Sequence, residues 1–378
     1  MRASSLLPHL LLVQPWGSRA FSRTVAARRT RVPLSVRTSP SSTSLESYTM
    51  HESFAEELID KYDGFILDQF GVLHNGLHAL DGTIELLEYL AKNKNKKLIV
   101  LSNTSAPSEK CLEKLPKFGF ERSHFVGAVT SGEEASKYIL RTFGSGDGQR
   151  SKALMLTWDA EIEDNPRLTA LPKAFVEKCG NIDIASTVEE ADFLLVHGSE
   201  VWYRGDNADG EGEATSLGSF IETGSMTEVL EPLLQQCLSR NIPCVCANPD
   251  LIVQTPSGGK AYMPGNIAQR YQDMGGTVHW FGKPQAEHFL ACLQSLDMPA
   301  DRVCHVGDSL HHDIAGAVSA AIPSIFVAST GIHLSDFTSA KFGELPRKEE
   351  LDDLIEKEGG NVPTHVIPAF RLASSQAN

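Results

Sequence analysis

The sequence predicts an α/β protein whose core is a Rossmann-like, doubly wound parallel sheet, with a second α/β domain inserted into that core. Three observations support this fold class. Short apolar runs alternate with segments of helical periodicity from residue 60 onward. The same alternation returns late in the chain. Between the two halves, from about 131 to 258, lies a stretch that is too long for a loop and has strand-like runs of its own.

The first part of the expected core runs from residue 46 to 130. Strands are expected at 64–69 (GFILDQ) and at 97–103 (KLIVLSN), and each is followed by a helical pattern, at 83–93 and at 108–119. Strands that alternate with helices in this way pair in parallel, with the connecting helices on the faces of the sheet.

The second part of the expected core runs from 259 to 345 and repeats the same order of elements. Residues 346–378 are expected to form a C-terminal extension. The expected strands are TVHWFGK (277–283), RVCHVGD (302–308) and PSIFVAS (323–329), and the expected helices are AEHFLACLQSL (286–296) and DIAGAVSAA (313–321).

The inserted domain, residues 131–258, contains strand-like runs at 153–158 (ALMLTW) and 192–197 (DFLLVH). Its stretch HGSEVWYRGD offers three groups that could face a substrate. The alternative is that they pack inside the domain or at a subunit interface. These groups are Trp202, Tyr203 and Arg204, and apolar packing is the default expectation for Trp158, Trp202 and Trp280.

The first 45 residues differ in composition from the rest of the chain. They contain seven arginines and many serines but no aspartate or glutamate. This composition is typical of an organelle transit peptide and predicts a mitochondrial protein, with the chloroplast as the alternative. Translation from Met50 would bypass the signal and leave the protein in the cytoplasm. A disordered tail is the alternative to a targeting signal.

Charge and hydropathy argue against several classes of function. The formal net charge is -14, and Lys and Arg do not cluster into the patch that nucleic-acid binding requires. No apolar run approaches the roughly 18 residues that a membrane-spanning helix needs. The seven cysteines lack paired spacing, and Cys244 and Cys246 lie in an expected strand, which favours buried, reduced thiols. We therefore expect neither nucleic acid nor membrane as a partner.

Polar side chains stand where the expected core strands end. Asp68 follows the first strand, and Ser102 and Asn103 close the second. Lys283 and Asp308 follow two strands of the later half. The carboxyl ends of parallel strands meet at one crevice, where open α/β sheets bind ligands. Carboxylates suit Mg²⁺, whereas a hydroxyl and an ammonium suit phosphate oxygens, so these residues predict a shared site for a cation and a phosphorylated ligand.

These residues lie in four motifs that resemble those of the haloacid dehalogenase (HAD) superfamily in order and spacing. The motifs are LDQFGVLHNG (67–76), LSNTSAPSEK (101–110), FGKPQAEHF (281–289) and HVGDSLHHDIAGA (305–317). The insert resembles the C2-type cap of class IIA, whose members include NagD-like phosphatases, and NPD (248–250) followed by YMPG resembles the return from that cap. The resemblance covers roughly residues 60 to 335 and implies a Rossmann-like core with an inserted α/β cap.

The resemblance also implies a role for each residue in the hydrolysis of a small phosphorylated metabolite. Asp68 would be the nucleophile that forms an aspartyl-phosphate, and Lys283 would stabilise the charge on the transferred group. A homodimer through the cap is compatible with this architecture. The implied phosphate-binding residues are Gln69, Gly71, Ser102, Asn103 and Lys283, and the implied Mg²⁺ ligands are Asp68, the backbone carbonyl of Phe70, Asp308 and Asp313.

Residue 70 departs from the superfamily pattern. Phosphatases of the superfamily carry a second aspartate there, which protonates the leaving group and later activates water, whereas this chain has Phe70. Loss of such an acid typically lowers a rate by roughly 10²–10⁴. The chain could act on a leaving group that needs little protonation, use His74 or a cap residue as the acid, or be a catalytically weak phosphometabolite-binding protein. Cleavage of a C–P or C–halogen bond is a further alternative.

Three other histidines lie near the fourth motif. Adjacent residues of a helix point about 100° apart, so His311 and His312 are not expected to share a zinc ion. For these two residues and for His305 we expect solvated or supporting positions around the site.

Overall fold

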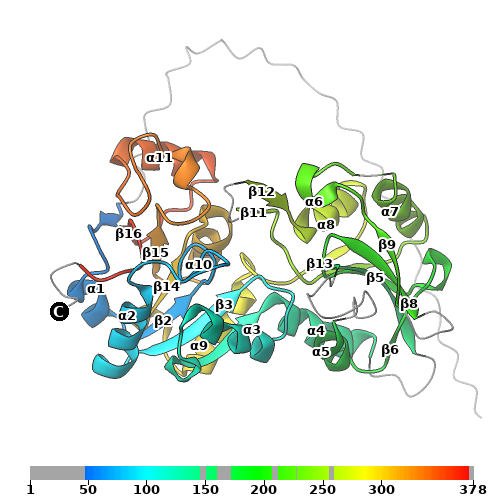
Figure 1. Cartoon of the computed structure of the whole chain (residues 1–378), viewed down its shortest axis with the longest axis horizontal. Helices are drawn as coiled ribbons and strands as arrows, with labels where there is room; N and C mark the ends of the chain where they lie inside the picture. The colour runs from blue at the N-terminus through cyan, green and yellow to red at the C-terminus, as the bar shows by residue number, and fades with distance from the viewer. Residues whose placement is uncertain are drawn as a thin grey trace, which may run out of the picture. The chain divides into compact units, whose positions relative to one another are not determined.

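The computed structural model describes residues 47–144, 150–159, 172–206, 212–226, 228–254 and 259–373. The expected transit peptide, residues 1–45, lies outside these ranges. Within them, two seven-stranded sheets and one two-stranded sheet form, and helices cover both faces of the larger sheets (Figure 1). The predicted fold class, a doubly wound parallel core with an inserted α/β domain, is confirmed.

The first sheet is parallel at each of its strand pairs and has the order β1-β16-β15-β14-β2-β3-β4. Its strands are β1 (Thr49–Met50), β2 (Gly64–Leu67), β3 (Lys97–Ser102), β4 (Phe125–Thr130), β14 (Val303–Gly307), β15 (Ser324–Val327) and β16 (His365–Ile367). The accompanying helices are α1 (Glu56–Lys61), α2 (Thr83–Glu88, followed by a π-helical turn at Tyr89–Asn93), α3 (Ser108–Lys114), α9 (Ala286–Leu296), α10 (Ala315–Ser319, preceded by a π-helical turn at Leu310–Ile314) and α11 (Lys348–Lys357).

The central strand β2 is buried on both faces. Phe65 and Leu67 pack with side chains of α1, α2 and α3, whereas Ile66 packs with α9 and α10 on the other face. All three side chains are fully buried, and each contributes about 1.5–3 kcal/mol through removal from water. Burial on both faces explains why β2 is an uninterrupted apolar run and why the first polar residue, Asp68, comes only at its end.

The second sheet is mixed and has the order β13-β10-β7-β5-β8-β9, with β6 also paired to β5. Helices α4 and α5 cover one face, and α6, α7 and α8 cover the other. A short hairpin, β11 with β12, follows β10. The elements are α4 (Ser131–Thr142), β5 (Ser151–Thr157), α5 (Lys173–Lys178), β6 (Ile182–Ile184), β7 (Phe193–Val196), β8 (Val201–Asp206), β9 (Gly212–Ser216), α6 (Phe220–Thr223), α7 (Leu230–Ser239), β10 (Cys244–Cys246), β11 (Ile252–Gln254), β12 (Lys260–Tyr262), α8 (Pro264–Asp273) and β13 (Val278–Trp280).

The strand expected in the core at 277–283 belongs to the second sheet instead. β13 pairs in parallel with β10, with Val278 opposite Cys244 and Trp280 opposite Cys246. Helix α8 packs on the same sheet, so the chain stays with it beyond the expected boundary at 258. The three residues of β13 are half-buried, as suits an edge strand beside β10. The prediction was wrong because the residue types of a short strand do not specify which sheet it joins.

The expected C-terminal extension, residues 346–378, contains two elements of the first sheet. Helix α11 packs its apolar face against that sheet, and β16 pairs with β15 on one side and with β1 on the other. The segment therefore completes the core. Three residues, His365 to Ile367, are too few to show the alternation by which a strand is recognised.

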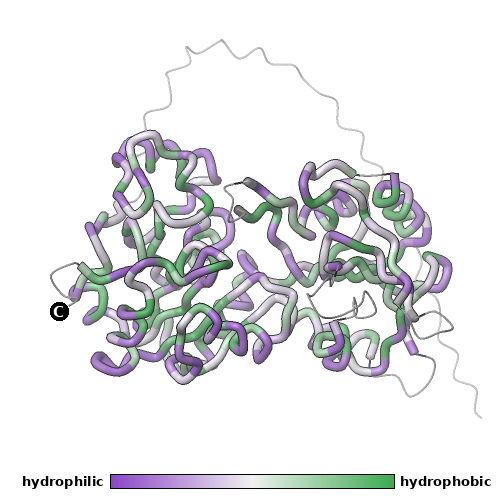
Figure 2. The backbone as a smooth tube through the Cα atoms, in the orientation of Figure 1, coloured by the Kyte–Doolittle hydropathy of each residue, from purple (hydrophilic) through white to green (hydrophobic). Residues whose placement is uncertain are grey.

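Burial follows the hydropathy of the chain. In Figure 2 the buried strands β2, β3 and β7 are largely hydrophobic, and hydrophilic stretches gather on the outer turns of the helices. All seven cysteines lie in described ranges, and each is buried and unpaired, as predicted. None of the helices in the described ranges has the length and hydropathy needed to cross a membrane.

Candidate active site

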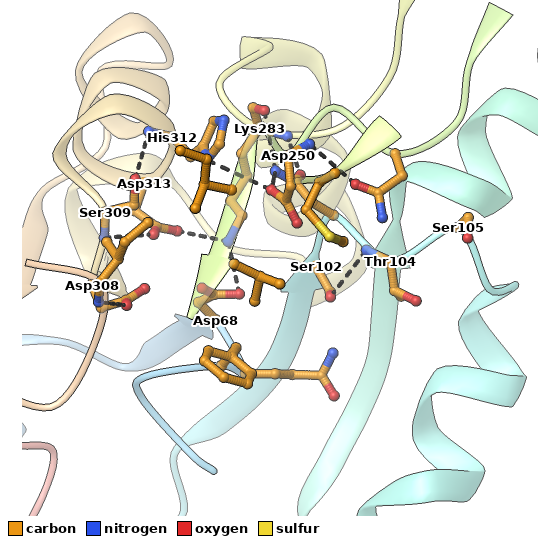
Figure 3. Close-up of a pocket in the computed structure, with 18 of the residues that line it drawn as sticks. Asp68, Ser102, Thr104, Ser105, Asp250, Lys283, Asp308, Ser309, His312 and Asp313 are labelled. Atoms are coloured by element: carbon orange, nitrogen blue, oxygen red, sulfur yellow. Dashed lines mark hydrogen bonds and ion pairs between the residues drawn. The ribbon is translucent and has the colours of Figure 1, made fainter. Parts of the chain in front are cut away.

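The polar residues at the strand ends surround one cavity of about 360 Å³. Asp68 follows β2, Ser102 ends β3 and Asp308 follows β14, while Lys283 comes from the loop between β13 and α9 (Figure 3). Asp313 lies in the turn that precedes α10. The structure thus brings together residues from four distant segments, as the sequence predicted, although the segment before Lys283 runs in the other sheet.

Lys283 lies between two carboxylates at the centre of the site. Its Nζ is 2.7 Å from Asp68 Oδ1 and 2.8 Å from Asp313 Oδ1. The lysine is 3% exposed, Asp68 is 9% exposed and Asp313 is fully buried. Burial alone would lower the pKa of Lys283, but Asp313 and Asp68 together hold it above its ordinary value. The lysine is therefore a permanent cation in this site.

The three carboxylates of the site differ in how their charge is balanced. Burial raises the pKa of Asp68 to about 7, although Lys283 opposes the shift. Burial, followed by the charges of Asp68 and Asp313, raises the pKa of Asp308 well above its ordinary value. Burial also opposes ionisation of Asp313, but Lys283 and His305 hold its pKa well below the usual range. Nearby positive charge thus stabilises the ionised form of Asp313, but it does not offset the burial of Asp68 and Asp308.

A divalent cation fits this arrangement. Oxygen atoms of Asp68, Asp308 and Asp313 all lie within 4.8 Å of one another. Carboxylate oxygens are the ligands that Mg²⁺ prefers, and the single ammonium of Lys283 does not balance three buried carboxylates. The donor set and the charge of the site therefore match the predicted Mg²⁺ ligands.

Asp308 is held by backbone that approaches it closely. Its Oδ2 accepts a hydrogen bond of 2.8 Å from the Ile332 N–H. Gly71 has φ +79°, and a Cβ on it would lie 2.2 Å from Asp308 Oδ2, while a Cβ on Gly331 would lie 1.8 Å from the same atom. The Gly71 carbonyl also accepts a hydrogen bond from Thr330 Oγ1. Only glycine at both positions lets the two loops enclose this carboxylate.

The backbone amides of Gln69 and Gly71, which were predicted to contact phosphate, have partners within the protein. The Gly71 N–H donates to the His74 carbonyl at 3.0 Å, so it is engaged within the turn. The Gln69 backbone N–H donates to the Asp68 carboxylate and acts to lower its pKa. These two hydrogen bonds orient Asp68 and close the turn, and the predicted phosphate contacts of the loop stay a prediction.

Ser102 and Asn103 have different surroundings. The Ser102 Oγ accepts a hydrogen bond of 3.3 Å from the Thr104 N–H, which leaves the hydroxyl hydrogen for a ligand. Asn103 Oδ1 accepts from the Lys283 N–H at 2.7 Å, and Nδ2 donates to Asp250 Oδ1 at 2.7 Å. The Asn103 side chain thus fixes the backbone of the lysine loop, and its predicted contact with phosphate stays a prediction.

His305 and His312 take supporting positions. His305 is fully buried, and its Nε2 lies 2.8 Å from Asp313 Oδ1. His312 lines the cavity, and its Nδ1 lies 3.6 Å from Asp250 Oδ1. Burial lowers the pKa of both imidazoles. His305 thus acts on the site through Asp313, whereas His312 and Asp250 border the cavity itself.

Phe70 lines the cavity together with two other rings. Its ring meets His74 edge-on, with centroids 6.2 Å apart, and His74 stacks on Phe118 at 4.1 Å. Burial lowers the pKa of His74 to about 4, and its Nδ1 accepts a hydrogen bond from the Gly76 N–H at 3.1 Å. The side chain that the sequence offered as a substitute acid is therefore a neutral ring in an aromatic wall.

The inserted domain adds residues that sequence reasoning did not place in the site. Trp158, directly after β5, lines the cavity and donates its Nε1–H to Ser105 Oγ at 3.1 Å, whereas core packing was expected for it. Asp250, the last residue of the NPD motif, lines it too. The resemblance of NPD to the return from a class IIA cap was the available signal for Asp250.

The groups of β8 that were offered as substrate-facing do not line this cavity. Trp202 packs against the core of the second sheet, and Tyr203 is buried. Arg204 pairs with Glu213 at 3.1 Å and lies over the Trp202 ring. The alternative expectation, packing within the inserted domain, describes these residues.

Comparisons with known proteins agree with the motifs. Two family models match, one described as haloacid dehalogenase-like hydrolase over residues 65–164 and one as HAD-hydrolase-like over residues 280–351. A 4-nitrophenylphosphatase of Schizosaccharomyces pombe is 23% identical over 332 residues, which are 85% of this chain and 96% of the relative.

Solved structures of other proteins share the fold. A haloacid dehalogenase-like hydrolase from Brucella suis has a TM-score of 0.59 at 20% identity, over 83% of this chain and 97% of that one. A glycerol phosphate phosphatase from Mycobacterium tuberculosis, solved in complex with magnesium, has a TM-score of 0.54 at 18% identity, over 83% and 77%.

Proposed function

We propose that this chain, which belongs to the haloacid dehalogenase-like hydrolases, is a Mg²⁺-dependent phosphatase that hydrolyses a small phosphorylated metabolite through an aspartyl-phosphate on Asp68. The observation that carries the proposal is the placement of the Lys283 ammonium between Asp68 and Asp313, beside a cavity that Ser102 and Asp308 also line. A nucleophile, a fixed cation and a hydroxyl donor are the groups that phosphoryl transfer requires.

Each step assigns a task to a residue of the chain. An oxygen of Asp68 attacks phosphorus, and the bond to the leaving oxygen breaks. Lys283 stabilises the charge on the transferred group, and the Ser102 hydroxyl donates to a phosphoryl oxygen. Water then attacks the phosphorus of the aspartyl-phosphate, which releases inorganic phosphate and regenerates Asp68.

Asp68, Asp308, Asp313 and the Phe70 carbonyl are the proposed residues that hold Mg²⁺. When bound, the cation neutralises the carboxylates and polarises a phosphoryl oxygen. The close approach of three carboxylate groups supports this proposal. The magnesium complex of the mycobacterial glycerol phosphate phosphatase, which shares the fold, supports it as well.

A second candidate function rests on Phe70. A protein with this phosphate and metal site but no acid beside the leaving group could bind phosphometabolites and turn them over slowly. The two candidates predict different rates of turnover. Retention of Asp68, Lys283 and Asp308 favours the phosphatase, since binding alone needs no nucleophile.

The test measures phosphate release by the full chain from a panel of phosphometabolites and from 4-nitrophenyl phosphate, with Mg²⁺ or with EDTA. Asp68→Asn should abolish Mg²⁺-dependent turnover. Asp81→Asn is the matched control, since this exposed aspartate lies outside the cavity, and it should leave turnover unchanged. Binding of phosphate without turnover of any ester would favour the binding protein, and turnover that survives in Asp68→Asn would refute the aspartyl-phosphate.

A further inference from the structure

We infer that the part of the cavity that receives the leaving group takes a flat, apolar ring, and that the preferred substrates are aryl phosphate monoesters. The inference rests on the proposed function, because it names the substrate class for the same site. The cavity wall beside Phe70 is aromatic, and a phenyl ring cannot supply a proton to the leaving group.

Three stacked or edge-on rings form one wall of the cavity. Phe70 and His74 meet at 88°, and His74 lies nearly parallel to Phe118, at 15°. The hydrogen bond from the Gly76 N–H to His74 Nδ1 holds the middle ring in its plane. Edge-to-face and offset-stacked contacts are the geometries in which a further ring adds favourably. The wall is thus a preformed surface for an aromatic group.

The residues that the inserted domain contributes are mostly apolar as well. Ile252, Val253 and Met263 line the cavity, together with Trp158. The hydrogen bond from Trp158 Nε1 to Ser105 Oγ satisfies its polar atom and fixes the indole. A substrate ring in this cavity would be covered by apolar groups on the side of the inserted domain and by the aromatic wall on the side of the core.

Asp250 is the carboxylate in this part of the cavity that could serve as an acid. Its Oδ1 already accepts the 2.7 Å hydrogen bond from Asn103 Nδ2, and Asn103 in turn holds the Lys283 backbone. This carboxylate oxygen is therefore already occupied, and His312 Nδ1 lies 3.6 Å from the same atom. Asp250 therefore positions the lysine loop, and the leaving group departs without its help.

Without a proton donor beside the leaving oxygen, the leaving group departs as an anion. In the first step the Asp68 oxygen bonds to phosphorus, the P–O bond to the leaving group breaks, and the electron pair stays on the leaving oxygen. A phenol has a pKa of about 10, as the tyrosine side chain does, whereas a hydroxyl comparable to that of water has a pKa of about 15.7. A phenolate can leave first and take its proton from solvent afterwards, while an alkoxide needs the acid that Phe70 replaces.

The test compares kcat/KM of the full chain with Mg²⁺ on phenyl phosphates of varied ring acidity and on glycerol 3-phosphate. For wild type, kcat/KM on phenyl phosphate should exceed that on glycerol 3-phosphate by a factor of about 10²–10⁴. This is the factor by which a missing acid lowers the rate for an alkyl ester. Phe70→Asp should raise turnover of glycerol 3-phosphate at least tenfold and weaken the dependence on ring acidity. Phe70→Leu should keep that dependence but raise KM for the phenyl esters several-fold. Phe342→Ala, at a ring 53% exposed and outside the cavity, is the control.

Binding gives an independent readout. Phenylphosphonate, which cannot be hydrolysed, should bind the Mg²⁺-loaded chain at least tenfold more tightly than methylphosphonate in calorimetry. Asp68-dependent turnover that favours glycerol 3-phosphate, or equal binding of the two phosphonates, would overturn this inference and leave the phosphatase intact. In that event loss of turnover in Asp250→Asn would identify the acid. Absence of Asp68-dependent turnover on every ester would instead refute the proposed function.

Discussion

Replacement of Lys283 by methionine should destabilise the protein strongly in the absence of divalent cations. The change removes the buried ammonium that lies 2.7 Å from Asp68 and 2.8 Å from Asp313. It leaves three carboxylates whose oxygens lie within 4.8 Å of one another. Removal of one partner from a buried ion pair costs about 3–5 kcal/mol, so we expect a loss of this size in the free energy of unfolding at pH 8.

The loss should depend on pH. The pKa of Asp68 is already raised to about 7 in the folded protein, and loss of the ammonium raises it further. An acid whose folded pKa is raised destabilises the fold increasingly as pH rises above its unfolded value of about 3.9. At pH 5 Asp68 takes up a proton in the folded state, and the deficit of Lys283→Met should therefore be smaller than at pH 8.

Urea denaturation of the full chain, followed by circular dichroism in EDTA and in MgCl₂, measures these effects. Lys341→Met, at an exposed lysine outside the cavity, should stay within about 0.5 kcal/mol of wild type. Mg²⁺ should reduce the deficit, because it supplies positive charge to the same carboxylates, and saturation at 100 times Kd is worth about 2.7 kcal/mol. A deficit below about 1 kcal/mol in EDTA at pH 8 would contradict the assignment of Lys283 as an obligatory buried counterion.

Two further predictions concern a loop and an imidazole. Gly71→Ala should lower the free energy of unfolding by about 2 kcal/mol more than Gly360→Ala and weaken Mg²⁺ binding in calorimetry. Both glycines have positive φ, but only at Gly71 would the Cβ meet other atoms, and equal losses would show that this crowding is harmless. His365→Asn should flatten the dependence of stability on pH. Burial lowers the pKa of His365 to about 4 in the folded protein, whereas its unfolded value is about 6.5. The free energy of unfolding of wild type should therefore fall by up to about 3 kcal/mol from pH 7 to pH 4. If the free energies of unfolding of wild type and variant, measured in urea, change equally with pH, His365 is not the source of the pH dependence.

The site could be predicted from sequence where local burial and a general rule of topology sufficed. The apolar runs before Asp68 and before Asp308 each predict a strand that is buried on both faces, and both strands are buried in the structure. Parallel pairing of β14 with β2 then places both carboxylates at one edge of the sheet. Ser102 follows from the same rule, because β3 pairs with β2.

The remaining features depend on contacts between segments that carry no local signal for each other. The run that forms β13 fits either sheet by its composition, and its partner β10 decides the matter. Phe118 joins Phe70 through His74, and Asp250 reaches the lysine loop through Asn103. In each case the meeting of side chains depends on how elements pack, which residue type and spacing do not specify.

The continuity of the second sheet bears on the order in which the chain can fold. Its strands come from one stretch of sequence, from Ser151 to Trp280. The first sheet must instead join β2 with β14 and β1 with β16 across that stretch. Closure of a long loop costs entropy that grows with its length. A second sheet that forms early, with Ser131 Oγ bonded to the Ala247 carbonyl at 2.7 Å, would shorten this loop and speed the nucleation of the first sheet.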